Sequence, residues 1–244
     1  MIALLPMYDR PETRTANDAL WQGIRNRLGY GPEKLSRDTG LWDAWQSRDL
    51  VLAQTCGYPF RARLHGKVML VATPVHDLSE CPAGHYFSVF VVRRCDPRKN
   101  LRDFADAVFA YNDALSQSGW AAPQNHARAL GFGFSNTLET GGHAASAQAV
   151  AEGRADIAAL DIVSWTLARR HDAFCADLRV IDRTAPTPAL PFITAPGNRA
   201  DTIRTALGGA IGALPPIHRT SLCLHGIVEI PAARYLEVPT PPAP

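Results

Sequence analysis

Apolar residues in the first third of the chain recur in short runs that polar turns interrupt. The run 2–6 predicts a buried strand. A helix is expected next, with Thr15 as its cap and Gly29 as its stop, because four apolar side chains share one helical face: Leu20, Trp21, Ile24 and Leu28. Runs 49–53 and 68–72 end in turn-prone residues and predict two more buried strands.

From residue 86 onward, short apolar runs alternate with segments of helical periodicity. The predicted strands are 86–92, 107–111, 155–160, 178–181 and 190–194, and the predicted helices are 119–130, 143–152 and 161–170. A last helix, capped by Asn198, has Ile203, Leu207 and Ile211 on one face. Strands that alternate with helices in this way are typical of a mostly parallel sheet.

Two such series of strands and helices predict an α/β protein of two lobes, each a mostly parallel sheet flanked by helices. We expect two crossing segments, near residues 84–92 and 186–195. Lobe 1 would then comprise residues 1–84 and 193–244, and lobe 2 residues 85–192. The proline-rich tail after Val238 is expected to lack regular structure.

Composition excludes several classes of protein. With 46% hydrophobic and 20% charged residues among 244, the chain can bury a substantial core. A net charge of +2, with dispersed arginines, argues against a nucleic-acid partner. No apolar run approaches the roughly 18 to 20 residues of a membrane span, so no membrane insertion is expected. Five widely spaced cysteines without a CxxC pair argue against a disulfide framework or a metal site, and no cofactor is expected.

The opening residues lack the pattern of a secretory leader. There is no basic segment, and the apolar run meets Tyr8, Asp9 and Arg10 too early for a leader with a cleavage site. A complete chain with this start would be cytoplasmic.

A polar turn between a predicted strand and a predicted helix contains Ser116, Gln117, Ser118 and Gly119. A helix start of this kind presents free backbone N–H groups and hydroxyls at the positive end of the helix dipole, where an anion binds well. An ordinary serine N-cap is the alternative for this segment.

Two further strand-to-helix junctions follow in the same lobe. Thr140, Gly142 and His143 open one helix, and Asp161 ends the strand before the next. Helix starts after neighbouring strands share the crevice at the carboxyl ends of those strands, so these residues are candidate ligand contacts. His143 could instead be a surface histidine. Asp161 fits either a helix N-cap or a contact to a ligand with a positive group or a hydroxyl.

In the first lobe, three residues follow predicted strands at comparable positions: Tyr8, Thr55 and Tyr58. Tyrosines offer flat apolar faces with a polar tip, which suits the lining of a ligand cleft. A partly buried aromatic at a lobe interface is the alternative for both tyrosines.

Three segments taken in order resemble the phosphonate, phosphate and phosphite type of substrate-binding protein of ABC transporters, which has the type II periplasmic-binding-protein fold. They are Gln54-Thr-Cys-Gly-Tyr58, Asn112-Asp-Ala-Leu-Ser-Gln-Ser-Gly119, and Thr140-Gly-Gly-His-Ala-Ala-Ser146 continued by Ala155-Asp-Ile-Ala-Ala-Leu-Asp161. The resemblance implies that Ser116, Ser118 and His143 contact the anion. The family often has Ser or Thr where this chain has Gly142.

By this resemblance the chain is a non-enzymatic protein that captures a small oxyanion such as a phosphonate, phosphate or phosphite between its lobes. An ABC permease would be its partner and the periplasm its compartment. Two alternatives use the same fold: a ligand-sensing protein, and an enzyme like those of thiamine-pyrimidine synthesis. The enzyme would need a lysine for pyridoxal phosphate and clustered cysteines, but Lys34, Lys67 and Lys99 lie outside the candidate segments and Cys56 has no cysteine neighbour.

Overall fold

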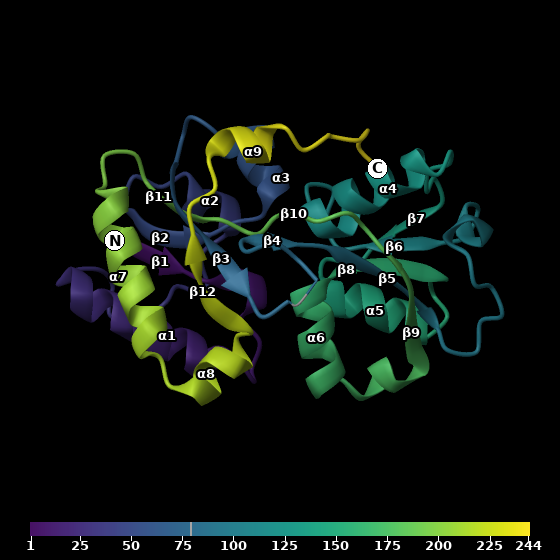
Figure 1. Cartoon of the computed structure of the whole chain (residues 1–244), viewed down its shortest axis with the longest axis horizontal. Helices are drawn as coiled ribbons and strands as arrows, with labels where there is room; N and C mark the ends of the chain where they lie inside the picture. The colour runs from purple at the N-terminus through teal and green to yellow at the C-terminus, as the bar shows by residue number, and fades with distance from the viewer. Residues whose placement is uncertain (79) are drawn as a thin grey trace. The chain divides into compact units, whose positions relative to one another are not determined.

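The computed structural model describes residues 1–78 and 80–244, which divide into two compact units (Figure 1). Unit 1 comprises Met1–His85 and Pro188–Glu237, and unit 2 comprises Tyr86–Thr187 and Val238–Pro244. Each unit has a five-stranded sheet with helices packed against it. The predicted α/β architecture of two units is therefore confirmed.

The boundaries of the units differ from the predicted ones at two places. Residues 188–192 lie in unit 1, and residues 238–244 lie in unit 2, so the chain passes between units three times rather than twice. Ala189 is held in unit 1 by its N–H, which donates to the Gly84 carbonyl, and by its own carbonyl, which accepts from the Tyr235 hydroxyl.

The C-terminal tail has no helix or strand after residue 236, yet hydrogen bonds hold it in unit 2. The indole N–H of Trp120 donates to the Pro242 carbonyl at 2.9 Å. The Asn125 amide donates to the Pro239 carbonyl at 2.8 Å. The tail thus belongs to the unit that contains these donors, and its placement with lobe 1 was wrong.

The described residues of unit 1 form six strands, one of which lies at the crossing, and six α-helices. The strands are β1 (Ile2–Leu4), β2 (Leu50–Gln54), β3 (Met69–His76), β4 (His85–Tyr86), β11 (Phe192–Thr194) and β12 (Leu224–Val228). The helices are α1 (Arg14–Leu28), α2 (Leu41–Trp45), α3 (Gly57–Pro59), α7 (Ala200–Ala213), α8 (Pro216–Ser221) and α9 (Ala232–Leu236). β4 pairs with β10 (Thr187–Pro188), so the two crossing segments form a short ribbon.

The sheet of unit 1 has the order β1-β2-β11-β3-β12 and is mixed rather than mostly parallel. β1 and β2 are parallel, whereas β11 is antiparallel to both β2 and β3, and β12 is antiparallel to β3. The reason is that β11, where the chain returns from unit 2, inserts between β2 and β3, which come earlier in the chain.

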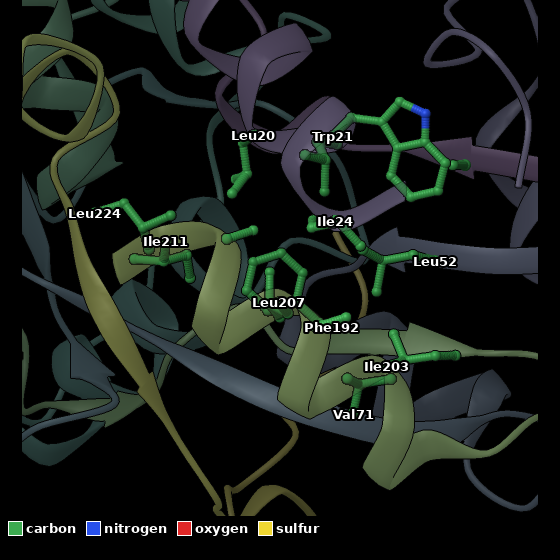
Figure 2. Close-up of a cluster of buried hydrophobic side chains, with 14 of the residues drawn as sticks. Leu20, Trp21, Ile24, Leu52, Val71, Phe192, Ile203, Leu207, Ile211 and Leu224 are labelled. Carbon is green, nitrogen blue, oxygen red and sulfur yellow. The ribbon is translucent and has the colours of Figure 1, made fainter. Parts of the chain in front are cut away.

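Side chains of successive strand residues point to opposite faces of this sheet, and each face has its own core. On one face, α1 and α7 pack through Trp21, Ile24 and Leu207 against Leu52 and Phe192 (Figure 2). The other face carries a second buried cluster: Leu4, Ala44, Trp45, Leu50, Ala53, Phe60, Leu64, Ile193, Ala195 and Tyr235. The apolar periodicity of the sequence therefore marks real buried faces.

The predicted caps of the two packed helices are displaced. α1 begins at Arg14, and Thr13 rather than Thr15 occupies the cap position, where its hydroxyl donates to the Tyr8 carbonyl at 2.6 Å. α7 begins at Ala200 after Arg199, and the Asn198 amide donates to the Leu50 carbonyl instead. The partner of Asn198 is far away in the chain, so local sequence does not reveal it.

Unit 2 has five sheet strands and three helices. The strands are β5 (Ser88–Arg93), β6 (Phe109–Tyr111), β7 (Thr137–Glu139), β8 (Ile157–Asp161) and β9 (Leu178–Arg183). The helices are α4 (Ala122–Ala129), α5 (His143–Ala151) and α6 (Ile162–His171), and a wide π-helical turn, Gln117–Ala121, leads directly into α4.

The sheet of unit 2 has the order β7-β6-β8-β5-β9. β7, β6 and β8 are parallel, and β5 is antiparallel to both of its neighbours. This sheet too is mixed, because β5 enters from the crossing in the opposite direction. The carboxyl ends of β7, β6 and β8 and the first residue of β5, Ser88, consequently lie along one edge. Among the described residues, no helix is both long and apolar enough for a membrane span.

Candidate functional site

Three helix starts meet at the carboxyl edge of the unit 2 sheet. Ser118 lies in the π-helical turn that follows β6, His143 is the first residue of α5 after β7, and Asp161 is the last residue of β8. β6 is bonded in parallel to both β7 and β8, which brings these three connections to one place. The predicted grouping of Ser118, His143 and Asp161 is present in the structure.

His143 connects the other two side chains. Its Nε2 lies 2.9 Å from the Ser118 hydroxyl and 3.4 Å from the Asp161 carboxylate. The His143 side chain is 13% exposed, and Ser118 is 3% exposed. The group is thus a nearly buried polar cluster within unit 2.

Burial lowers the pKa of His143 below its ordinary value, and this effect outweighs the Asp161 charge and the nearby Ala159 backbone, which both favour the imidazolium. The imidazole is therefore neutral near pH 7. It contributes hydrogen bonds to the cluster rather than a fixed positive charge.

Asp161 caps α6, as one of its two sequence interpretations required. One carboxylate oxygen accepts from the backbone N–H groups of Val163 and Ser164, both at 2.9 Å. The other oxygen accepts from the Ser164 hydroxyl and faces His143. These partners occupy the carboxylate without any cationic ligand.

Ser116 and Ser118 have different roles in the same turn. Ser116 is the cap of the turn, because its hydroxyl accepts from the Gly119 N–H at 2.9 Å. Ser118 is not a cap. Its carbonyl accepts from the Ser88 hydroxyl at 2.8 Å, which fixes the backbone while the Ser118 hydroxyl faces His143. Gln117, between the two serines, is buried as well.

Gly119 is required by the side chain that packs against it. A Cβ atom built on Gly119 would lie 1.8 Å from Oδ1 of Asn112, which is far inside van der Waals contact. Asn112 directly follows β6 and therefore holds the turn close to the sheet edge. Sequence analysis singled out Gly119 only as part of a helix start, and it did not identify Asn112 as its packing partner.

Thr140 and Gly142 shape the loop before α5. The Thr140 hydroxyl donates to carbonyls and pairs with the Ser146 hydroxyl at 2.7 Å. It is thus engaged inside the loop. Gly142 occupies the cap position of α5, while the positive φ of the loop belongs to Gly141, at +82°. This pair of glycines positions His143 at the start of its helix.

The predicted residues of unit 1 lie near the carboxyl ends of β1 and β2. Tyr8 contacts His76 edge to face, with ring centroids 5.5 Å apart. Both line a hollow with other residues of unit 1: Leu5, Asn17, Leu20, Gln54, Pro74, Phe192, Leu222 and Leu224. Gln54 and His76 were missed as candidates, although Gln54 opens a segment that carries the family resemblance.

Thr55 and Tyr58 follow Gln54 closely in the chain. Both are buried, but neither lines the hollow. The Thr55 hydroxyl is fully buried and has no hydrogen-bond partner among the described residues. The Tyr58 ring is covered by the Arg61 guanidinium at 4.4 Å from the ring centroid. Shared ligand contact between these residues and the unit 2 cluster stays a prediction.

The cluster in unit 2 does not have the geometry of a catalytic triad. In a Ser-His-Asp triad the serine and the carboxylate contact opposite nitrogens of the imidazole. Here Ser118 and Asp161 both face Nε2 of His143. The carboxylate therefore does not hold the imidazole through Nδ1 as it does in a triad, and the arrangement suits binding rather than nucleophilic catalysis.

Fold and site together define the class of two-unit α/β solute-binding proteins. A family model described as "ABC transporter, phosphonate, periplasmic substrate-binding protein" matches residues 2–213, and the chain belongs to this family. The family consists of periplasmic binding proteins rather than enzymes, and its members deliver small ligands such as phosphonate to an ABC transporter. The resemblance inferred from the sequence is confirmed.

Solved structures agree on the fold. PhnD1 from Prochlorococcus marinus in complex with methylphosphonate aligns with a TM-score of 0.75 at 16% identity, over 96% of this chain and 93% of that one. The binding protein of an ABC phosphonate transporter from Pseudomonas aeruginosa aligns with a TM-score of 0.73 at 16% identity, covering 93% and 81%.

XAC2383 from Xanthomonas citri bound to ATP aligns with a TM-score of 0.69 at 18% identity, covering 97% and 94%. No curated protein matches the sequence significantly. The TM-scores establish that the fold is shared. The sequence identities are low, so the ligand of this chain has to be argued from its own residues.

Proposed function

We propose that this chain binds a phosphonate, or a phosphate or phosphite of similar size, with the anionic group at the unit 2 cluster. Ser118 is the central contact, with His143 beside it and Ser116, Gln117 and Thr140 shaping the surrounding turns. A single observation carries the proposal: the nearly buried Ser118 hydroxyl lies at a helix start and is held by a neutral imidazole.

The chemistry of these groups favours an oxyanion. The turn 117–121 leads into α4, and α5 starts at His143, so both helices direct the positive ends of their dipoles toward this edge. Hydroxyl and backbone N–H donors in a nearly buried place bind anionic oxygens strongly, because charge-assisted hydrogen bonds are strong where water is excluded.

Tyr8, Thr55 and Tyr58 are proposed to contact the ligand from unit 1. The buried Thr55 hydroxyl supports this role, because a buried polar group without a partner is costly unless a ligand or water satisfies it. Delivery of the bound ligand to an ABC permease completes the proposed function.

A thermal-shift screen tests the ligand class. We expect methylphosphonate, other alkylphosphonates, phosphate or phosphite to raise the melting temperature, because a ligand that binds only the native state stabilises it by mass action. Sulfonates, which also carry a tetrahedral oxyanion, serve as the control for shape. Malate and ATP should be included, because proteins of the same fold are described as bound to these ligands. Stabilisation by ATP or malate alone would contradict the proposed class.

A further inference from the structure

The tautomer of His143 decides what the Ser118 hydroxyl can do. A neutral imidazole carries one N–H hydrogen, on either Nδ1 or Nε2. Nε2 faces both the Ser118 hydroxyl and the Asp161 carboxylate, whereas Nδ1 has no hydrogen bond of normal geometry among the described residues. The rival position for the hydrogen is Nδ1, and the Ala159 backbone, which favours the imidazolium, is the competing neighbour of the ring.

The Asp161 carboxylate favours the Nε2–H form. A carboxylate only accepts hydrogen bonds, so a lone pair on Nε2 would face the carboxylate lone pairs at 3.4 Å. With the hydrogen on Nε2, the N–H group and the carboxylate attract each other instead. Nε2–H can then also donate to the Ser118 oxygen, which lies at 2.9 Å.

The tautomer of His143 also decides whether the Ser118 hydroxyl accepts a hydrogen bond from His143 or donates one to it. When His143 donates to the Ser118 oxygen, the single hydroxyl hydrogen of Ser118 is not used by His143 and can be donated to another acceptor. When Nε2 carries a lone pair, Ser118 donates to it and has no hydrogen left for an anion. Only the first state is useful for binding an oxyanion.

We propose that Asp161 is a positioning residue that keeps His143 in the Nε2–H tautomer and thereby leaves the Ser118 hydroxyl free to donate to the ligand oxyanion. Its effect on affinity rests on the proposed function, whereas its effect on the imidazole is a property of the free protein. Asp161 acts through His143 and is not itself a contact for a cationic group, because its four hydrogen-bonding positions are occupied inside the protein.

The variant Asp161→Asn separates this role from a simple charge effect. Asn caps helices about as well as Asp, so α6 should keep its start. The asparagine NH₂ can face His143 and favours a lone pair on Nε2, which turns the Ser118 hydrogen inward. We expect methylphosphonate affinity to fall about tenfold or more, the effect of losing a hydrogen bond to a charged group. Removal of a negative charge beside an anion site would by itself raise affinity, so the two explanations predict opposite signs.

Two measurements decide the outcome. The ¹⁵N chemical shifts of His143, assigned with the variant His143→Gln among the eight histidines of the chain, report the tautomer directly. We expect Nε2–H in the wild type and Nδ1–H in Asp161→Asn. An Nδ1–H tautomer in the wild type, or an unchanged tautomer in the variant, would overturn the proposal whether or not methylphosphonate binds.

The chain offers a matched control. His126 Nε2 faces the Asp182 carboxylate at 3.1 Å in the same unit and outside the candidate site. Asp182→Asn makes the same chemical change beside a histidine and should leave methylphosphonate affinity as in the wild type. Calorimetry on Asp161→Asn in a Ser118→Ala background completes the cycle. There, the loss of affinity should disappear, and a loss of the same size would refute the role of Ser118. Failure of the wild type to bind any screened oxyanion, with the expected tautomers present, would refute the proposed function alone.

Discussion

Ser118→Ala tests the anion site most directly, because it removes one hydroxyl from the buried cluster and no helix cap. If that hydroxyl donates to a phosphonate oxygen, its loss should weaken binding by about 1.5 to 3 kcal/mol, the range for a hydrogen bond to a charged group. This free energy corresponds to a rise in Kd of about 10- to 150-fold.

Ser116→Ala is the matched control two residues away. The Ser116 hydroxyl accepts from the Gly119 N–H, so its removal should cost about 1 kcal/mol of folding free energy, as for other helix caps. We expect Ser118→Ala to change affinity much more than stability and Ser116→Ala to show the larger change in stability. The contrast follows from which serine is the cap in the structure.

Titration calorimetry against the best ligand from the screen measures the affinities, and urea unfolding measures the stabilities. Wild-type affinity in Ser118→Ala would refute the assignment of the anion site, even though the family membership would stand. A fall in stability of Ser118→Ala by several kcal/mol without a change in Kd would show that the hydroxyl serves only the fold.

The other predictions concern packing, pH and the tail. Gly119→Ala should destabilise the protein in urea unfolding by about 1 to 3 kcal/mol, because its methyl group would collide with Asn112, whereas Gly133→Ala, with 3.5 Å to its nearest neighbour, should change stability by less than about 0.5 kcal/mol. Burial lowers the folded-state pKa of His143, so its contribution to stability should be present above the ordinary pKa of 6.5 and be lost as pH falls through the lowered value. His143→Gln should flatten this acid-side loss in unfolding curves recorded at several pH values, and an unchanged pH profile would contradict it. Deletion of residues 239–244 should remove the hydrogen bonds from Trp120 and Asn125 and cost about 1 to 3 kcal/mol, and a deletion without effect in a thermal melt would show that the tail contributes nothing.

Local sequence predicted the strand-to-helix junctions of unit 2 because each has a strong local signal. At Ser116–Gly119 an apolar run ends, a polar turn follows and helical periodicity begins. At Thr140–His143 the signal is the glycine pair before the helix, and the short strand β7 in front of it was not predicted. Local sequence also led to the family. It did not reveal the direction of the strands, since a short buried strand has the same pattern whether its neighbours are parallel or antiparallel.

The contacts inside the candidate site were out of reach for a different reason. Ser118 and His143 are 25 residues apart in the chain, and they meet because the strands that precede them, β6 and β7, are neighbours in the sheet. The clash that makes Gly119 necessary depends on where Asn112 lies in space. Such facts follow from topology and packing rather than from periodicity.

The sequence presented cap and ligand contact as rival roles for each polar residue at these junctions. The structure instead distributes the capping among particular residues: Ser116 caps the turn before α4, and Asp161 caps α6. The turn before α4 and the start of α6 therefore do not need the hydroxyl of Ser118 or the imidazole of His143 as a cap. These two side chains are therefore the ones that the protein can commit to a ligand, and the caps hold them in place at the sheet edge.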